Sequence, residues 1–267
     1  MNILVCVKQV PDTTEIKIDP VKNTLIREGV PSIVNPFDGY ALEAAARIKD
    51  KNPDTKIVAL SMGPEQAKAA LKECLAIAAD KAYLVSDRAF GGSDTLATSY
   101  ILSHTIQKVE ELEGNFDAIF CGKQAIDGDT AQVGPEIAEH LDLPQVTYGL
   151  EAEADGGALR VRKEVEEGVE VIAVRTPCVV TFTKPAWEPR YPTLKRKLAA
   201  GRAEIPTLTA ADLPAIDLAN AGLKGSPTKV KRTFVPQKKT GGVKIQEADG
   251  GAAAKKLYEK IGEAGIV

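Results

Sequence analysis

The sequence has few aromatic residues and no long hydrophobic run, and each absence excludes a class of function. Phenylalanine, tryptophan and tyrosine together make up 5% of the 267 residues. We therefore expect no wall of aromatic side chains that would stack on a cofactor or on nucleic-acid bases. No stretch approaches the roughly 18 consecutive apolar residues that a membrane-spanning helix needs. The formal net charge of −3 gives no basic surface of the kind that binds nucleic acid.

The four cysteines do not form a metal-binding pattern. Cys6, Cys121 and Cys178 lie in short apolar runs that read as strands, and Cys74 lies in a helix-like run. No Cys-x-x-Cys or Cys/His spacing indicates a zinc site or an iron–sulfur cluster, so we expect no metal. The first residues, MNILVCVKQV, read as a strand rather than as a signal or transit segment, which favours a cytoplasmic location.

Strand-like and helix-like segments alternate in the first half of the chain. Short apolar runs at residues 3–7, 56–61, 81–86 and 117–121 are typical of buried strands. Apolar residues recur at helical spacing between them, which predicts helices over 39–51, over 64–78 with Pro64 in the first turn, and from about Ser93 to Leu112. This alternation predicts a parallel sheet with right-handed crossovers. Ligands of such sheets bind beyond the carboxyl ends of the strands.

Three regions depart from this alternation. Residues 13–38 contain two alternating stretches around Asp19-Pro20, which predict a small hairpin. Residues 145–182 have strand-like alternation with glycine turns, and we interpret them as antiparallel strands that extend the sheet. From Lys184 onward, scattered prolines predict an irregular arm, with one short helix near the end of the chain.

The segment GKQAIDGDTAQVGP is the strongest candidate for a binding site. It follows a strand-like run and leads into a helix-like run, so its free backbone N–H groups and the helix dipole favour a bound anion. Gly122 and Gly128 permit a close approach of the backbone. The side chains of Asp127, Asp129 and Thr130 can cap the helix or bind a ligand hydroxyl. An ordinary loop with a good helix cap explains the same pattern.

Three polar segments follow strand-like runs and should meet at one edge of the sheet. Residues 6–10 end the first strand, residues 62–64 follow the second, and residues 122–134 follow a later one. Because one crevice can collect all three, their placement favours a nucleotide site over an ordinary loop.

The loop at 122–135 also resembles, nearly letter for letter, the nucleotide loop of the small (beta) subunit of electron-transferring flavoproteins. Other parts of that family pattern appear in order: VKQVPDT at 7–13, NPFD at 35–38, SMGP at 61–64, RVRKEVEEGVEVIAVRTPCVVT at 160–181 and EPRYPTLKRK at 188–197. Several separate motifs in the right order over most of the chain are far more specific than any one of them.

The resemblance implies a fold and a partner. The fold would be α/β, with a Rossmann-like parallel sheet of the adenine nucleotide alpha-hydrolase type, an antiparallel strand extension and an irregular C-terminal arm. Residues 1–190 would form the nucleotide- or flavin-binding domain. Residues 191–267 would form a recognition loop and an arm that packs on a larger alpha subunit, which carries its own FAD.

The resemblance also implies which residues contact the cofactor and the partners. The cofactor-binding positions would be Cys6, Lys8, Asn35, Pro36, Phe37, Asp38, Met62, Gly63, Gly122, Gln124, Asp127, Gly128, Asp129, Thr130, Ala131, Gln132, Val133 and Gly134. Asn35 would read an adenine or ribose edge, and the backbone N–H groups of 130–134 would meet phosphate. Leu194 would anchor in a partner dehydrogenase, supported by Tyr191, Lys195, Arg196 and Lys197. Glu164 would contact the mobile flavin domain of the alpha subunit.

The function that the resemblance implies is electron transfer within a heterodimer. VPDT at 10–13, NPFD at 35–38 and DGDTAQVGP at 127–135 look more like flavoproteins whose beta subunit holds FAD, accepts hydride from NADH and bifurcates the electrons. One electron would go to ferredoxin or flavodoxin, and one through the alpha-subunit FAD to an acyl-CoA dehydrogenase. The chain would therefore carry electrons rather than convert a substrate by itself.

Three alternatives stay open. A housekeeping beta subunit would bind AMP as a structural nucleotide, and an adenine-nucleotide sensor of the universal-stress type would have no redox chemistry. FGGSDT at 90–95 faintly resembles the loop of ATP pyrophosphatases, although it follows a later strand than in those enzymes. His104 and His140 have no acid or nucleophile beside them in sequence, so we assign them structural roles.

Overall fold

The computed structural model describes residues 1–12, 31–231 and 241–266. These residues fall into two compact units, residues 1–12 with 31–231 and residues 241–266. We call the first the α/β unit. The hairpin predicted within 13–38 lies largely outside the described residues. Its described ends, β2 (Gln9–Pro11) and β3 (Ser32–Val34), form an antiparallel pair.

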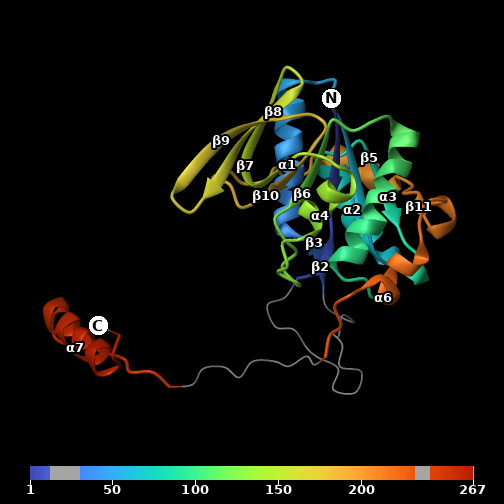
Figure 1. Cartoon of the computed structure of the whole chain (residues 1–267). Helices are drawn as coiled ribbons and strands as arrows, with labels where there is room; N and C mark the ends of the chain where they lie inside the picture. The colour runs from blue at the N-terminus through green and yellow to red at the C-terminus, as the bar shows by residue number, and fades with distance from the viewer. Residues whose placement is uncertain (13–30, 232–240, 267) are drawn as a thin grey trace. The chain divides into compact units, whose positions relative to one another are not determined.

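A nine-stranded sheet forms the centre of the α/β unit, in the order β11-β5-β4-β1-β6-β10-β7-β8-β9 (Figure 1). The strands from β11 to β7 run parallel, and β8 and β9 continue the sheet antiparallel. Their bounds are β1 Asn2–Cys6, β4 Lys56–Met62, β5 Lys81–Val85, β6 Ala118–Gly122, β7 Gln145–Asp155, β8 Ala158–Val165, β9 Gly168–Arg175, β10 Cys178–Phe182 and β11 Thr207–Leu208. The predicted Rossmann-like α/β fold with an antiparallel extension is confirmed.

The prediction that all strands between residues 145 and 182 are antiparallel is wrong for β10. This strand inserts between β6 and β7 and is parallel to both. All five of its residues, CVVTF, are buried. Such a run suits a strand with both faces covered, whereas β8 and β9 alternate buried and exposed positions or are largely exposed.

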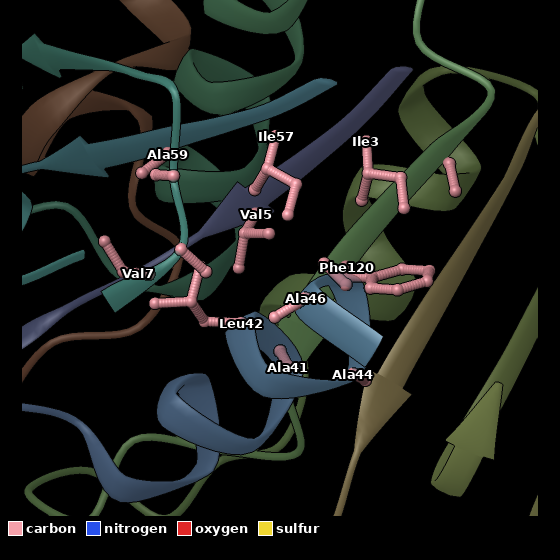
Figure 2. Packing of buried hydrophobic residues seen from close by; sticks show 14 of the residues in the cluster. Ile3, Val5, Val7, Ala41, Leu42, Ala44, Ala46, Ile57, Ala59 and Phe120 are labelled. Carbon is pink, nitrogen blue, oxygen red and sulfur yellow. The ribbon is translucent and has the colours of Figure 1, made fainter. Parts of the chain in front are cut away.

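Two pairs of helices cover the two faces of the parallel sheet. α1 (Pro36–Lys51) and α2 (Lys68–Ile77) pack on one face, where Ile3 and Val5 project. Figure 2 shows Leu42 and neighbouring alanines of α1 directed at these strands. α3 (Thr95–Glu113) and α4 (Val133–His140) pack on the opposite face, where Leu4 projects. Alternate residues of one strand therefore serve two cores.

Two predicted helix starts differ from the observed ones. A 3₁₀ turn at Glu65–Ala67 follows Pro64, so α2 begins only at Lys68. The third predicted helix begins at Thr95 rather than near Ser93, because the carboxylate of Asp94 caps it by accepting the N–H of Ala97 at 3.1 Å.

The region predicted to be irregular contains several short elements. They are α5 (Leu194–Arg202), α6 (Gly222–Gly225), the edge strand β11 and two 3₁₀ turns, Ala210–Asp212 and Leu218–Asn220. Outside this region, another 3₁₀ turn, Arg88–Phe90, precedes α3. β11 was not foreseen, because two residues after a proline carry no periodic signal. In the structure, residues 191–231 belong to the same unit as the sheet. That residues 191–267 lie on an alpha subunit stays a prediction about the assembled heterodimer.

The second unit contains α7 (Gly250–Glu263), the short helix predicted near the end of the chain. Asp249 caps it, and none of its residues is buried within this chain. Across the described ranges of both units, no helix combines the length and the apolar character needed to cross a bilayer.

Candidate functional site

The predicted segments meet at the carboxyl edge of the parallel strands. Lys8 follows β1, and its ammonium lies 2.6 Å from the Oδ1 atom of Asp127 in the loop after β6. The Asp127 side chain is 9% exposed, whereas that of Lys8 is 47% exposed. Met62 ends the neighbouring strand β4, Gly63 follows it, and both are half-buried. The edge therefore brings together residues from three parts of the sequence.

Asn35 holds the loop in place from the start of α1. Its side chain is fully buried, donates from Nδ2 to the carbonyl of Gln124 at 2.8 Å, and accepts the N–H of Ile126 at 3.1 Å. Both ends of the amide are thus engaged inside the chain. That this side chain reads an adenine or ribose edge stays a prediction, and the motif alone did not reveal these two partners within the chain.

Asp38 joins the ends of β1 and β6. Its carboxylate is 6% exposed and accepts the N–H of Lys8 at 2.7 Å and that of Gly122 at 3.1 Å. Burial raises the pKa of Asp38 to about 7, against the opposing effect of these hydrogen bonds. A Cβ at Gly122 would lie 2.7 Å from the backbone nitrogen of Asp38, so this position requires glycine.

The loop between β6 and α4 has a strained backbone. Asp129 and Ala131 both have φ of 53°, in the left-handed region that non-glycine residues seldom adopt. Each such residue costs about 1 kcal/mol or more, and strain of this kind clusters at binding sites. The side chain of Gln124 donates to Asp129 at 2.7 Å, and the N–H of Asp129 bonds the carbonyl of Ala125 at 2.8 Å. These bonds hold the strained turn.

The N-terminus of α4 is open. Its cap residue is Gln132, which makes no side-chain cap hydrogen bond. Of the two predicted roles for Asp127, Asp129 and Thr130, capping of this helix is not observed, since the two aspartates bind Lys8 and Gln124 instead. Binding of a ligand hydroxyl stays a prediction. Among the described residues, the backbone N–H groups of Thr130, Ala131, Gln132 and Val133 have no acceptor. Consecutive free N–H groups in a left-handed to right-handed turn form a concave anion site. We call these four N–H groups the cradle.

The two glycines of the loop differ in what they permit. A Cβ at Gly134 would lie 2.6 Å from Cγ2 of Thr181, so this glycine lets α4 pack on β10. A Cβ at Gly128 would meet nothing within 4 Å. The fold therefore does not require glycine at 128.

Three further predicted cofactor positions, Cys6, Pro36 and Phe37, lie at the end of β1 and the start of α1. Pro36 is exposed, and the half-buried ring of Phe37 packs edge-on against Tyr40 at 6.2 Å. Cys6 is half-buried beside buried Cys121 on the next strand. A hydrogen bond with Cys6, together with burial, raises the pKa of Cys121, so this thiol stays protonated.

Sequence reasoning missed two groups at this edge. The hydroxyl of Thr95 in α3 lies 3.1 Å from Oε1 of Gln132 and 3.2 Å from Oε1 of Glu136. The other carboxylate oxygen of Glu136, Oε2, is buried without a partner in the described part of the chain. Tyr148 has φ of 59°, and the ammonium of Lys123 lies 5.0 Å from the centre of its ring. Only the pair Tyr148-Gly149, a bulky residue before a glycine inside a strand, signals the irregularity.

The predicted docking segment, residues 191–197, lies elsewhere on the α/β unit. Tyr191 is 92% exposed and Leu194, the first residue of α5, is 74% exposed. Lys195 and Lys197 are exposed, but the guanidinium of Arg196 donates to carbonyls at the end of α2. Arg196 is thus engaged within the chain rather than free as a rim charge.

The strand extension carries Glu164, and a cavity lies on its helix side. Glu164 is exposed on β8, opposite Val169 of β9. The cavity, of about 530 Å³ between α1 and β7, is lined by residues such as Arg47, Trp187 and Arg190. None of the predicted cofactor positions in the described residues lines it.

The loop that resembles that of ATP pyrophosphatases and the two histidines make contacts within the chain. The loop at 90–95 is engaged by residues 222–228: the N–H of Gly222 bonds Ser93, and Thr228 donates to Asp94 at 2.7 Å. His104 and His140 flank the ring of Tyr100. Within the described ranges, no three His, Cys, Asp or Glu side chains are grouped so as to hold a metal ion.

The fold and this edge define a Rossmann-like α/β protein with a strained loop and an uncapped helix start after its central strand. Comparison with known proteins gives the family. The electron transfer flavoprotein domain matches residues 22–213. The chain is 53% identical over 265 residues, 98% of each chain, to the electron transfer flavoprotein subunit beta of Megasphaera elsdenii.

Two further relatives carry other names. The chain is 47% identical to the caffeyl-CoA reductase-Etf complex subunit CarD of Acetobacterium woodii over the full length of both. It is 46% identical to protein FixA of Azorhizobium caulinodans over 88% of this chain and 85% of the relative. The chain belongs to the electron transfer flavoprotein family, as a beta subunit. A beta subunit implies an alpha-subunit partner.

Proposed function

We propose that this beta subunit binds FAD at the cradle and works in an electron-bifurcating heterodimer. The observation that carries the proposal is the open N-terminus of α4. Four consecutive backbone N–H groups, those of residues 130–133, have no acceptor in the described chain, and left-handed backbone at Asp129 and Ala131 turns them toward the same side. The cradle matches the diphosphate of a dinucleotide in both charge and donor chemistry.

The residues around the cradle fit the rest of a nucleotide. Thr130 is exposed and offers a hydroxyl, and open space surrounds Gly128. Lys8 offsets the negative charge of Asp127 at the same edge, which would otherwise repel a phosphate. Bound FAD would supply hydride exchange with a pyridine nucleotide and single-electron exchange with proteins. This chain's residues would bind it, orient it and set the local charge.

The wider function rests on the resemblance and on the docking segment. Three segments at 10–13, 35–38 and 127–135 resemble beta subunits that hold FAD and accept hydride from NADH. The relative in Acetobacterium woodii is named as part of a complex with a reductase of a CoA thioester. An acyl-CoA dehydrogenase is therefore the proposed high-potential partner, and ferredoxin or flavodoxin the low-potential one. A cytoplasmic location accords with these partners.

AMP is the second candidate ligand, because the cradle would accept its single phosphate equally well. The structure gives no reason to prefer a sensor of the universal-stress type, and such a sensor would require no docking segment. The heterodimer, purified with its alpha subunit and denatured with acid, releases its nucleotides for chromatographic counting. We expect FAD and no AMP. AMP in a one-to-one ratio with FAD would support the housekeeping type, and extractable ATP without flavin the sensor.

A further inference from the structure

The docking segment, residues 191–197, is exposed at its apolar positions but fixed to the sheet unit by two arginines. Arg190 immediately precedes it, and Arg196 lies within it. Each makes several hydrogen bonds to a different helix of the α/β unit. Surface loops are ordinarily mobile, whereas this segment is fixed at both ends by side-chain hydrogen bonds.

Arg190 binds two carboxylates of α1 at once. Its Nε atom donates to Glu43 at 2.7 Å, and Nη2 donates to Asp50 at 2.6 Å. Its backbone N–H donates to Glu43 at 3.1 Å, so the main chain is held as well as the side chain. The Glu43 side chain is 4% exposed, which makes this a largely desolvated, charge-assisted pair.

Arg196 binds the carboxyl end of α2. Its guanidinium donates to the carbonyls of Leu75 and Ala79, each at 2.9 Å, and to that of Ala76 at 3.2 Å. The last carbonyls of a helix lack partners within the helix, and a cation is favoured there. One side chain thus completes α2 and fixes the first turn of α5.

The residues between the two arginines are ordered locally. The side chain of Thr193 accepts the N–H of Arg196 at 3.3 Å, and its carbonyl accepts the N–H of Lys197 at 2.9 Å. Pro192 restricts the backbone before this cap. The exposed side chains of Tyr191 and Leu194 therefore project from a fixed backbone.

We propose that Arg190 and Arg196 are positioning residues that hold the docking segment in its binding conformation before a partner protein arrives. The proposal rests on the docking role given to this segment above. A segment that is already ordered loses less entropy on binding, and a partner's apparent affinity falls by the fraction of molecules that are disordered.

The test measures binding of the FAD-loaded heterodimer to purified acyl-CoA dehydrogenase. Arg190→Lys keeps the charge but cannot bond both carboxylates. We expect the dissociation constant to rise about tenfold, because ordering even one residue costs 1–2 kcal/mol. Amide hydrogen exchange of residues 194–197 in the free heterodimer should become faster, while flavin content stays unchanged. Arg88→Lys, at an exposed arginine of the turn before α3, is the matched control.

Arg196→Lys tests the second anchor independently, which matters if Arg190→Lys lowers the thermal midpoint of the heterodimer. A rim charge would behave differently: Lys197→Ala should alter the salt dependence of binding without changing hydrogen exchange. Wild-type affinity in both arginine variants would overturn the proposal, even with faster exchange. If Leu194→Ala also leaves affinity unchanged, the docking role itself fails. If Leu194→Ala alone weakens binding, only the positioning role fails.

Discussion

Lys8 and Asp127 lie 119 residues apart in the sequence, and their side chains form an ion pair of 2.6 Å. The pair joins the end of β1 to the loop that carries the cradle. Because Asp127 is nearly buried, its carboxylate depends on this ammonium for a charged partner. The loop conformation is thereby tied to the first strand of the sheet.

Lys8→Met should weaken nucleotide retention by the heterodimer. Removal of the ammonium leaves the negative charge of Asp127 uncompensated beside the cradle, where the proposed phosphate would bind. We expect a loss of about 1 kcal/mol in binding, because Lys8 itself is half exposed to solvent. Equilibrium dialysis against the nucleotide measures the change. Lys51→Met, which removes the surface pair with Glu153, is the control and should have no effect on retention.

Gly128→Leu should abolish nucleotide binding and leave the fold intact. In this chain a Cβ at position 128 meets nothing, so a clash arises only with a ligand that approaches the loop. Gly134→Leu should instead disrupt the packing of α4 on Thr181 and lower the thermal midpoint. Wild-type nucleotide content in a folded Gly128→Leu variant would remove the ligand from this loop.

Acid should destabilise the protein through Glu113. Burial opposes its ionisation, but hydrogen bonds from Lys56, Lys81 and Tyr83 outweigh burial and lower the pKa of Glu113 to about 2. The carboxylate therefore stabilises the fold above its ordinary pKa, and this contribution is lost as pH falls from about 4.5 toward 2.

Glu113→Gln should remove that part of the acid dependence. The shift corresponds to roughly 3 kcal/mol at neutral pH, as an order of magnitude. The thermal midpoint of the variant should be lower at pH 7, and the drop between pH 5 and 3 should be smaller than in wild type. Glu111→Gln, at an exposed pair with Lys108, should retain the wild-type profile. Identical slopes for Glu113→Gln and wild type would show that another group governs acid unfolding.

Leu194→Ala should weaken the binding of an acyl-CoA dehydrogenase without changing flavin content. An apolar side chain that is 74% exposed in this chain and buried in a partner commonly contributes on the order of 2 kcal/mol. Surface plasmon resonance with the heterodimer should show the loss mainly as faster dissociation. Leu112→Ala, at an exposed leucine near the end of α3, provides the comparison. Equal affinities for the two variants would assign Leu194 to the solvated surface.

Sequence periodicity and motif order predicted most of the sheet. The runs 3–7, 56–61, 81–86 and 117–121 correspond to β1, β4, β5 and β6 within one or two residues. β10 was assigned the wrong direction because its partners are decided by topology. The apolar run CVVTF indicates a strand with both faces covered, but it does not show which strands become its neighbours.

The hydrogen-bond partners of the site residues could not be predicted from the sequence, because they come from distant parts of the chain. The motif located the loop, but Asn35 and Asp127 bind chain groups that are 89 and 119 residues away. The sequence analysis placed Arg196 among the charges that support partner docking, because no sequence pattern reveals that the end of α2 lies beneath this residue. Tyr148 was missed since its left-handed backbone follows from a bulge between strands, not from its own preference.

We propose that this beta subunit holds an FAD that NADH reduces. The most direct test is an anaerobic NADH titration of the purified heterodimer, followed by visible absorbance and paired with a flavin count. We predict two FAD per heterodimer and bleaching of both by NADH. One FAD with one AMP per heterodimer, and no bleaching by NADH, would contradict the account.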